Sequence, residues 1–521
     1  MGRGARIAKW TGGLVLAAVV AVGGLVVWLT QADAGRARLM RTIVSAANGV
    51  FDGRGRLVIG ELRSANPRAI DARNVQLVDS VGVPILTAAR VRGRISINDV
   101  RRGVVRITSL ELDSVTLDLT RDFEGPFNLQ WLISGDPSRP PSPPRPPRLG
   151  DDVRIDQVVL REGRIVVTLP WEPHELFVGA ERDSVTVVYD SLHDLRRVPG
   201  GLLLRRTITI GTLVAHDLHA VTPDDAPGTI TIDSATLVVS DPPVTVRDLQ
   251  GVVQWYDDSL TFRASRVLLP DSRLAAGGTI GWGEPGPVSY DVAIDAPDVA
   301  LSDINWTWPV LPTTGRASAK VRLRTLENRD HLEIALTDLD ADAMDSKVQG
   351  SLTMETQPRD FLLRDVALAF TPMTTALAAR LTEDLLPPEL DGRITGRFIA
   401  REGGPLDALR IDTLLLAFDD AVTPGARSRL RASGVVAIGV NPTARDLRVT
   451  DLSVDLRTVR TVVPDLPELV NGMVSGTARI ASASLEAADV RDLTLRWTDD
   501  AGHVSVSYTH LRAHETKAKL V

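Results

Sequence analysis

Alternation of apolar and polar residues runs through this chain from residue 57 onward, and it constrains the fold more than any other feature. In the segment 105–119 the apolar residues alternate and change parity twice, as they do in strands interrupted by a bulge or a tight turn. The same pattern returns at 153–169, and again at 208–215. Such a strand has one apolar and one polar face, and its apolar face has to be covered. The body of the chain is therefore predicted to be all-β.

A longer repeat is marked by glycine. The segments LPTTGRASAKVRL, LPPELDGRITGRFIA and LPELVNGMVSGTARI align at Gly315, Gly392 and Gly472, and the two intervals between them are nearly equal. Each glycine is followed by alternating apolar residues and preceded by a segment of helical potential, such as 374–386. A fixed period with a glycine at a turn is typical of stacked units that bury one another's faces. We therefore predict a repeating β region over 151–505, with these three residues as its turn glycines.

The N-terminus carries a long uncharged apolar segment, residues 10–32. As a helix it would reach roughly 35 Å, which is enough to span a bilayer. A cleaved secretory signal is the alternative, because Ala32-Asp33-Ala34 is a passable small-x-small cleavage site. We predict an uncleaved transmembrane helix whose anchoring residues are the tryptophans near its two ends and four of its leucines: Trp10, Leu14, Leu16, Leu25, Trp28 and Leu29.

The orientation of this anchor follows from its flanks. Three basic residues precede it, and Arg36, Arg38 and Arg41 follow it closely, so the positive charges are nearly balanced. A short basic tail, residues 1–9, kept in the cytoplasm with the long remainder exported is the simplest topology. The expected location is the inner membrane of a two-membrane bacterium, with a single pass and the body in the periplasm.

The remaining segments divide the chain further. A short amphipathic helix is expected at 36–48, where an N-terminal β module over 36–135 begins. Seven prolines between residues 137 and 147 predict an exposed linker or loop over 136–150. An SH3-type ligand would need a cytoplasmic partner. The last residues, 506–521, read as a translated sequencing adaptor, and a genuine polar tail is the alternative.

Signals of catalysis or ligand chemistry are not found in the sequence. The net charge of −7 argues against a nucleic-acid binder, and the absence of cysteine excludes disulfides and cysteine-bound metals. His216 and His219 are close in sequence, but in a strand they point to opposite faces. Paired aspartates fall at turns, where solvated side chains are the rule. Phosphate-binding loops and nucleophile elbows are missing. We therefore predict no enzyme activity, no cofactor and no metal site.

Over most of its length the chain resembles the N-terminal portion of the TamB and AsmA-like family of envelope proteins. The resemblance rests on the anchor, on GRGRLVIGELRSANPRAIDARNVQLVDSVGVPILTAARVRGRISI (Gly53 to Ile97), and on VVRITSLELDSVTLDLTRD and FNLQWLI, which lead into the proline-rich segment. The family's motifs are degenerate, and its C-terminal region is not found here. The resemblance implies a long, curved antiparallel sheet rolled into an apolar groove, with a few short helices.

The same resemblance implies a function beside membranes. The groove would carry the acyl chains of phospholipids between the inner and outer membranes and so support outer-membrane biogenesis. A partner β-barrel in the outer membrane would meet the missing C-terminal region. A chaperone that pairs its strands with unfolded outer-membrane proteins is the alternative. A surface β-solenoid adhesin is a further possibility, but calcium sites and asparagine ladders are not evident.

Overall fold

A computed structural model describes residues 54–513 of the 521-residue chain, with gaps at 67–68, 97–98, 100–104, 122, 124–126, 135–152, 222–226, 257, 282–287, 327–330, 359–360, 383–385, 439–442, 463–470, 485–487 and 500. The predicted cytoplasmic tail, the anchor with its six residues, the helix at 36–48 and the proline-rich segment lie outside the described residues. Among the residues that are described, no helix is both long and apolar enough to cross a bilayer.

The chain divides into two compact units, of which the first contains the described residues up to 270 together with 275–292. Its sheet follows the order β1-β2-β3-β4-β5-β7-β8-β10-β11, and β6 and β9 pair with the ends of β7 and β8. The bounds are β1 (Gly55–Asn66), β2 (Ala69–Asp79), β3 (Pro84–Ile95), β4 (Val105–Thr120), α4 (Asn128–Ser134), β5 (Val153–Trp171), α5 (Ala180–Leu192), β6 (Asp194–Val198), β7 (Gly201–Val221), β8 (Gly228–Ser240), β9 (Pro243–Val246), β10 (Asp248–Trp255) and β11 (Ser259–Leu268).

The second unit contains residues 271–274 and the described residues from 293 onward. Strands β12 (Arg273–Gly281) and β13 (Ser289–Ala300) have residues in both units. From β14 the sheet follows the chain in antiparallel order to β25, except that short β19 pairs with β17. The bounds are α6 (Leu301–Ile304), η2 (Asn305–Thr307), β14 (Arg316–Thr325), β15 (Leu332–Ala343), β16 (Ser346–Thr356), β17 (Phe361–Thr374), α7 (Thr375–Leu381), β18 (Gly392–Ala400), β19 (Gly404–Pro405), η3 (Leu406–Ala408), β20 (Leu409–Asp420), β21 (Arg427–Ala437), β22 (Thr443–Asp455), α8 (Leu456–Val462), β23 (Met473–Ala483), β24 (Ala488–Thr498) and β25 (Val504–Ala513).

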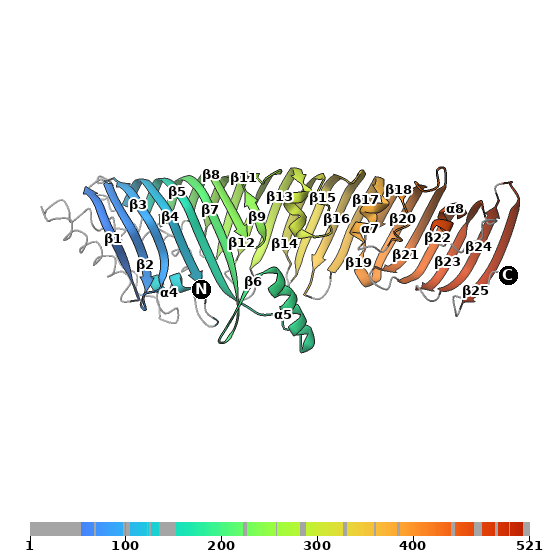
Figure 1. Ribbon diagram of the computed structural model, residues 1–521, viewed down its shortest axis with the longest axis horizontal. Helices are drawn as coiled ribbons and strands as arrows, with labels where there is room; N and C mark the ends of the chain where they lie inside the picture. Colours follow the sequence, from blue (N-terminus) through green and yellow to red (C-terminus); the bar gives the residue numbers. More distant parts are fainter. Residues whose placement is uncertain are drawn as a thin grey trace. The chain divides into compact units, whose positions relative to one another are not determined.

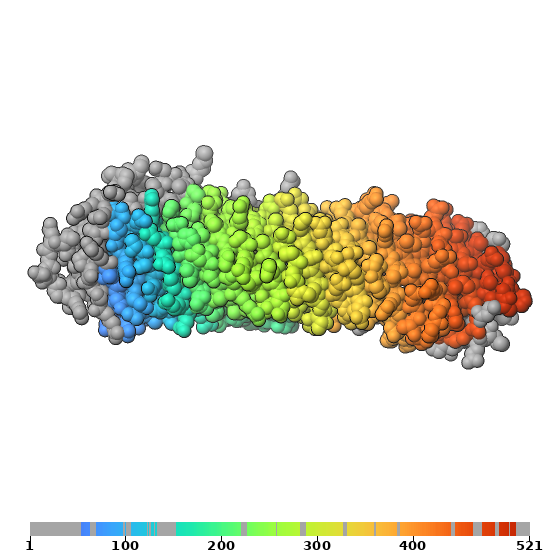
Figure 2. Space-filling model, turned by 90° about the horizontal axis from the view of Figure 1, so that it is seen from above, coloured from blue at the N-terminus to red at the C-terminus, as the bar shows by residue number. Residues whose placement is uncertain are grey.

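The predicted all-β body with a few short helices is confirmed. Within each unit the colour of the chain changes steadily from strand to strand (Figure 1), and the space-filling view shows the same progression (Figure 2). Strands that follow one another in sequence are therefore neighbours in the sheet. Most of the hydrogen bonds that hold each unit together consequently join segments that are close in sequence.

One pair corrects the prediction of a purely antiparallel sheet. Strands β4 and β5 are parallel, and Val105 lies opposite Val153 while Thr120 lies opposite Thr168. Every pair in this register has the same offset along the chain, and that offset is the period at which the sequence pattern of 105–119 returns. A parallel pair needs a crossover connection, and residues 121–152, which include α4, connect the end of β4 to the start of β5.

The core of the first unit lies on one face of its sheet. Sixteen buried apolar residues form one cluster that extends from β1 to β7. Leu129 and Leu132 of α4 belong to the same cluster, so this helix covers part of the face. The second unit has a smaller cluster, in which Val366, Ala400 and Leu409 are buried together. The two units therefore differ in how completely their apolar face is covered.

Candidate functional site: an apolar face along the second unit

A row of apolar residues and glycine crosses nine neighbouring strands of the second unit, from β15 to β24. Each member is the direct cross-strand partner of the next, so all of them lie on one face of the sheet. The row consists of Leu339, Gly350, Leu368, Phe398, Leu414, Ala432, Val449, Ala478 and Leu493.

A second row runs beside the first, a short step along each strand. It begins on β14 and consists of Ala317, Ala341, Val348, Phe370, Gly396, Leu416, Leu430, Leu452, Gly476 and Leu495. The two rows together define what we call the apolar face of the second unit. Ile394 and Phe418 extend it toward the edge at which the short helices lie.

Bulges keep the two rows in phase. Between Leu336 and Leu339 the strand β15 has one residue more than the facing segment of β16, so Thr337 or Asp338 is extra. An extra residue also occurs around Asp365 on β17. Both aspartates adopt a positive φ, of 54° and 50°. A bulge restores the inward direction of the following side chains, which explains why the apolar pattern changes parity along these strands.

The two faces of this sheet differ in exposure. On β20 the side chains of Leu414 and Leu416 are half-buried, whereas Leu415 between them is 39% exposed and Ala417 is exposed. Among the described elements of this unit, extensive packing joins only strands that neighbour each other in the sheet, or a strand and a short helix. A second described layer does not cover the two rows, and most of their side chains are half-buried; Ala432 and Val449 of the first row are buried.

Small residues limit the height of this surface. Gly350, Gly396 and Gly476 lie in the rows, and an added Cβ at each would collide with a carbonyl oxygen of the adjacent strand. These glycines therefore allow close approach of neighbouring strands. Phe370 and Phe398 are the aromatic members of the rows. The remaining members are aliphatic, which leaves a surface of low relief along the strands.

The opposite face of the second unit is charged. A depression of about 1270 Å³ opens there among β20, β21, β22, β23 and β24. Its lining includes four arginines and four aspartates: Arg410, Arg448, Arg479, Arg491, Asp412, Asp446, Asp489 and Asp492. Arg479 and Asp492 approach to 4.0 Å. Charges of both signs are interspersed, as on an ordinary solvated sheet face.

The first unit repeats the arrangement with deeper burial. One row passes from β1 to β8 through Leu57, Leu77, Leu86, Leu117, Ile165, Ile208 and Val239. Several of these side chains belong to or pack against the buried cluster that α4 helps to cover. On the other face, Arg90 donates to Asp71 over 2.9 Å, and this hydrogen bond lowers the pKa of the Asp71 carboxyl. The second unit therefore offers the more accessible apolar face.

The repeat glycines lie at equivalent places in the second unit. Gly315 and Gly472 directly precede β14 and β23, and Gly392 begins β18. The carbonyl oxygens of Gly315 and Gly472 accept from the first backbone N–H of α6 and α8, at 3.1 and 2.9 Å. Gly392 is bonded instead to the Thr375 hydroxyl at the start of α7. Each glycine thus joins a short helix to the strand that follows it.

A second element of the repeat is a serine beneath each helix. The residue before each helix is the last residue of a strand. Its backbone N–H donates to the hydroxyl of a serine that lies at or next to the start of the strand before that one. The three pairs are Ala300 with Ser272 (2.9 Å), Thr374 with Ser346 (2.8 Å) and Asp455 with Ser428 (3.1 Å). The sequence analysis did not identify these serines, although they recur at nearly the same period as the glycines.

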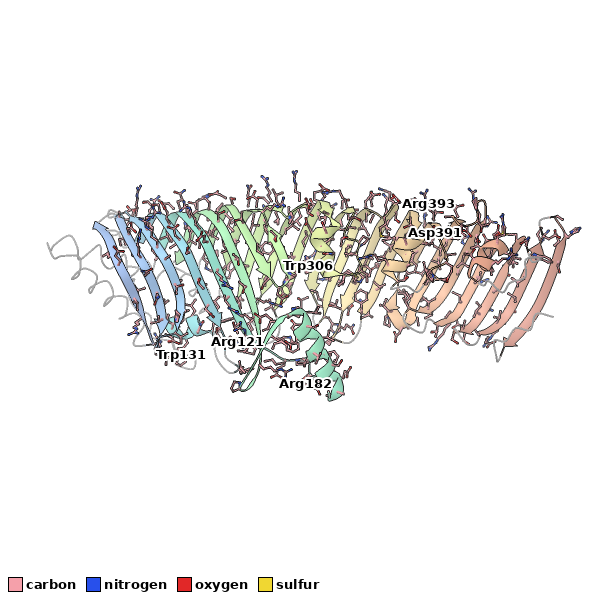
Figure 3. All side chains as sticks on the ribbon, viewed as in Figure 1. Arg121, Trp131, Arg182, Trp306, Asp391 and Arg393 are labelled. Carbon is pink, nitrogen blue, oxygen red and sulfur yellow. The ribbon has the colours of Figure 1, made fainter. Side chains whose placement is uncertain are left out.

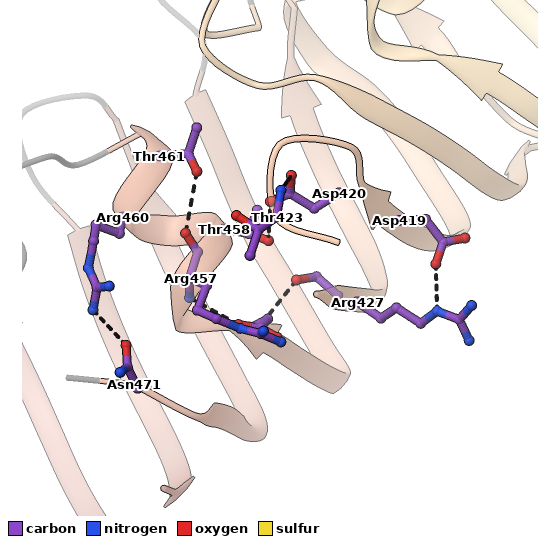
Figure 4. A network of polar contacts seen from close by, with 11 residues as sticks. Asp419, Asp420, Thr423, Arg427, Arg457, Thr458, Arg460, Thr461 and Asn471 are labelled. Carbon is purple, nitrogen blue, oxygen red and sulfur yellow. Dashed lines mark hydrogen bonds and ion pairs between the residues drawn. The ribbon is translucent and has the colours of Figure 1, made fainter. Parts of the chain in front are cut away.

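Polar contacts around α8 extend this motif (Figure 4). Thr458 donates to the buried carboxylate of Asp420 over 2.7 Å, and Asp455 accepts from the backbone N–H of Arg457 over 3.0 Å. Burial raises the pKa of Asp455, but the side-chain and backbone hydrogen bonds from Arg457 outweigh it, so the pKa lies below its usual value. These contacts fix the helix at the edge of the sheet and indicate a structural role.

The prediction that His216 and His219 point to opposite faces is wrong, because a bulge between them gives β7 an extra residue and places both on the same face of the sheet. His216 and His219 lie on β7 opposite Thr231 and Thr229. His216 Nδ1 is 2.9 Å from a carboxylate oxygen of Asp233, and this hydrogen bond raises the pKa of the imidazole. Within the described part of the chain, His, Asp and Glu side chains nowhere gather in a group of three or more that would suit a metal ion.

No family model, curated protein or solved structure matches this chain. The class that the fold and the apolar face define is an open β-sheet protein with one charged face and one partly accessible apolar face. The resemblance to the TamB and AsmA-like family stays a prediction.

Proposed function

We propose that the apolar face of the second unit binds the acyl chains of phospholipids and that the protein carries these lipids between two membranes. The observation that supports this proposal is the pair of uninterrupted rows, which cross nine and ten strands and have no described layer above them. In the proposed setting the chain is anchored in a bacterial inner membrane, its body is periplasmic, and it supports outer-membrane biogenesis.

The energetics favour a continuous surface over isolated pockets. Each CH₂ group kept from water is worth about 0.8 kcal/mol, so an acyl chain that crosses water unprotected meets a high barrier. Consecutive strands of the second unit present similar aliphatic side chains about 4.8 Å apart. A chain that leaves one position therefore finds an equivalent neighbour, and movement along the rows requires little net change in burial.

A rolled sheet would complete this picture. In the proposed form the sheet curves about its apolar face, so acyl chains lie inside a groove while headgroups remain in water at its rim. The interspersed charges of the opposite face keep the outside of the groove soluble. The short helices follow the ends of strands at one edge of the sheet.

Photo-crosslinking at adjacent residues tests the proposal. A photoreactive amino acid is placed at Leu414, on the apolar face, or at Leu415, on the opposite face, in the full-length chain in bacterial cells. We expect phospholipid adducts at residue 414 and none at residue 415, detected by mass spectrometry of the purified protein. Adducts with unfolded outer-membrane polypeptides at 414, without lipid, would support strand chaperoning and overturn lipid carriage. Equal lipid labelling at both positions would also contradict the proposal.

A further inference from the structure

Helix α5 of the first unit is exposed along its whole length. It has no buried residue, and its main packing partner is the short strand β6 that follows it. In the ribbon view it projects from one edge of the sheet, and the labelled Arg182 marks its first turns (Figure 3). Most helical stability in proteins comes from packing of an apolar face, so a helix packed this little needs another reason for its order.

An aromatic stack fixes the orientation of α5. The ring of Tyr189 lies between Trp171 at the end of β5 and His193 after the helix, with ring centroids 4.3 and 3.9 Å apart. His193 Nδ1 is 2.9 Å from Asp241 Oδ2, and Arg206 donates to the same oxygen over 3.1 Å. The stacked rings, with His193 held in place by Asp241, fix the position of the helix. The stack thereby presents the exposed sides of α5 in one direction.

The side of α5 next to Tyr189 carries an apolar stripe, which consists of Val185, Val188 and Leu192. Their spacing of i, i+3 and i+7 places them on one face of the helix. Val188 is 57% exposed and Leu192 is 72% exposed, while Val185 at the base of the stripe is half-buried. In the turn before the helix, Leu176 and Val178 add apolar surface with exposures of 48% and 68%. Exposed apolar residues gathered on one element in this way point to an interaction site.

The charge around the stripe indicates the partner. Residues 172–192 contain five carboxylates and one arginine, which gives a formal charge of −4 (one minus five). The residues are Glu172, Glu175, Glu181, Asp183 and Asp190 with Arg182. Such a segment is repelled by the anionic surface of a bacterial membrane. It is attracted to a protein surface that carries lysine and arginine.

We propose that α5 is a docking helix whose stripe enters an apolar groove of a protein partner with a basic rim. Insertion of an amphipathic helix into a groove is a common mode of recognition, and its anchors have the same i, i+3 and i+7 spacing. The carboxylates that flank the stripe would pair with the rim and set the orientation of the helix. This docking site is independent of the proposed lipid surface, which lies on the second unit.

Crosslinking in cells identifies the partner. A photoreactive amino acid is placed in the full-length chain at Val188, and in a matched control at Val238, a residue of β8 that is 47% exposed. We expect one discrete adduct with a different polypeptide at residue 188 and none at residue 238. Adducts only with phospholipid, adducts only with a second copy of this chain, or an absence of adducts would overturn the proposal.

Binding of the purified partner then tests the chemistry. Val188→Asp should weaken binding about tenfold or more, because a carboxylate enters the apolar groove. Val187→Asp is the control, since Val187 is 64% exposed on a different side of α5. The double substitution Glu181→Lys and Asp183→Lys, or a rise in salt from about 0.05 to 0.5 M, should also weaken binding several-fold. Equal effects of the two valine substitutions, or binding that ignores both charge and salt, would contradict the proposed contact.

Discussion

Acidic residues with positive φ occupy the points at which strands of the second unit change parity. Asp338 and Asp365 have φ values of 54° and 50° and lie where β15 and β17 gain a residue over their neighbours. Aspartate and asparagine tolerate this left-handed conformation better than other residues with a Cβ. A parity change at an aspartate is therefore a readable sign of a bulge. In the first unit Ser114, between Leu112 and Val115, has the same backbone conformation.

Asp365→Val tests this reading at the residue scale. A β-branched side chain at a φ of 50° is strained, so we expect the variant to lose about 1–3 kcal/mol in free energy of unfolding. Asp365→Gly is the control, because glycine adopts this conformation without strain and should stay within about 1 kcal/mol of the parent. Urea unfolding followed by circular dichroism measures both. Equal destabilisation by the two substitutions would rule out backbone conformation as the cause.

The buried Asp455 carboxylate predicts a pH dependence. Its pKa in the folded protein lies below the ordinary 3.8. A carboxylate with a depressed folded pKa stabilises the fold above its unfolded pKa, and this stabilisation is lost as the pH falls through the folded pKa. We therefore expect the free energy of unfolding to fall below about pH 4, and the fall to be shallower in Asp455→Asn. Urea titrations between neutral pH and about pH 3 measure the slope, and identical slopes in both proteins would contradict the assignment.

At the scale of elements, a serine, a short helix and a glycine recur as one structural motif. Each helix lies between one strand and the next. The residue before the helix donates its backbone N–H to a serine, and the first residue of the helix is hydrogen-bonded to the repeat glycine. Backbone groups at a helix end need partners outside the helix. The motif supplies those partners, so helices of only four to seven residues are stable at the sheet edge.

Ser346→Ala tests the motif. The substitution removes the acceptor of the Thr374 N–H at the start of α7, and an unsatisfied buried donor costs about 1–3 kcal/mol. Ser351→Ala is the matched control, because Ser351 is a half-buried serine on the same strand and is not part of the motif. Urea unfolding of both variants measures the difference. A loss at position 351 as large as that at 346 would show that the helix contact is not the source.

At the scale of the whole molecule, the proposed function depends on the continuity of the apolar rows. A row that crosses nine strands is useful for transport only if no member blocks it. Leu368 lies in the first row, between Gly350 and Phe398. Ala367 precedes it on the opposite, exposed face of the same strand. The two residues therefore separate an effect on the apolar face from an effect on β17 in general.

Leu368→Asp should interrupt the row. We expect the amount of phospholipid that co-purifies with the protein to fall several-fold, because a carboxylate on the apolar face is costly to cover with an acyl chain. Ala367→Asp should leave the lipid content unchanged. Quantitative lipid mass spectrometry of the two purified variants, after their circular dichroism spectra are shown to match the parent, makes the comparison. Equal lipid content in both would place the bound lipid elsewhere.

The alternation of residues was sufficient to predict the β class and the division of each strand into two faces. It determines the side on which Leu414 and Leu416 lie, because successive side chains of a strand point in opposite directions. The period of the glycines, by contrast, could not specify their contacts, because the hydrogen bonds to the short helices come from residues outside the aligned segments. The parallel pairing of β4 and β5 was missed, because equal patterns at a fixed period are compatible with either direction.

The sequence by itself determined the β character of this protein and the apolar or polar nature of each strand face, because both are local properties of the residue pattern. Only the tertiary structure decided which residues become neighbours across strands. The two rows depend on register, and register depends on bulges and turns that shift one strand against another. The exposure of α5 was decided in the same way. A stripe at helical spacing is usually buried, and here no described element of the first unit packs over it.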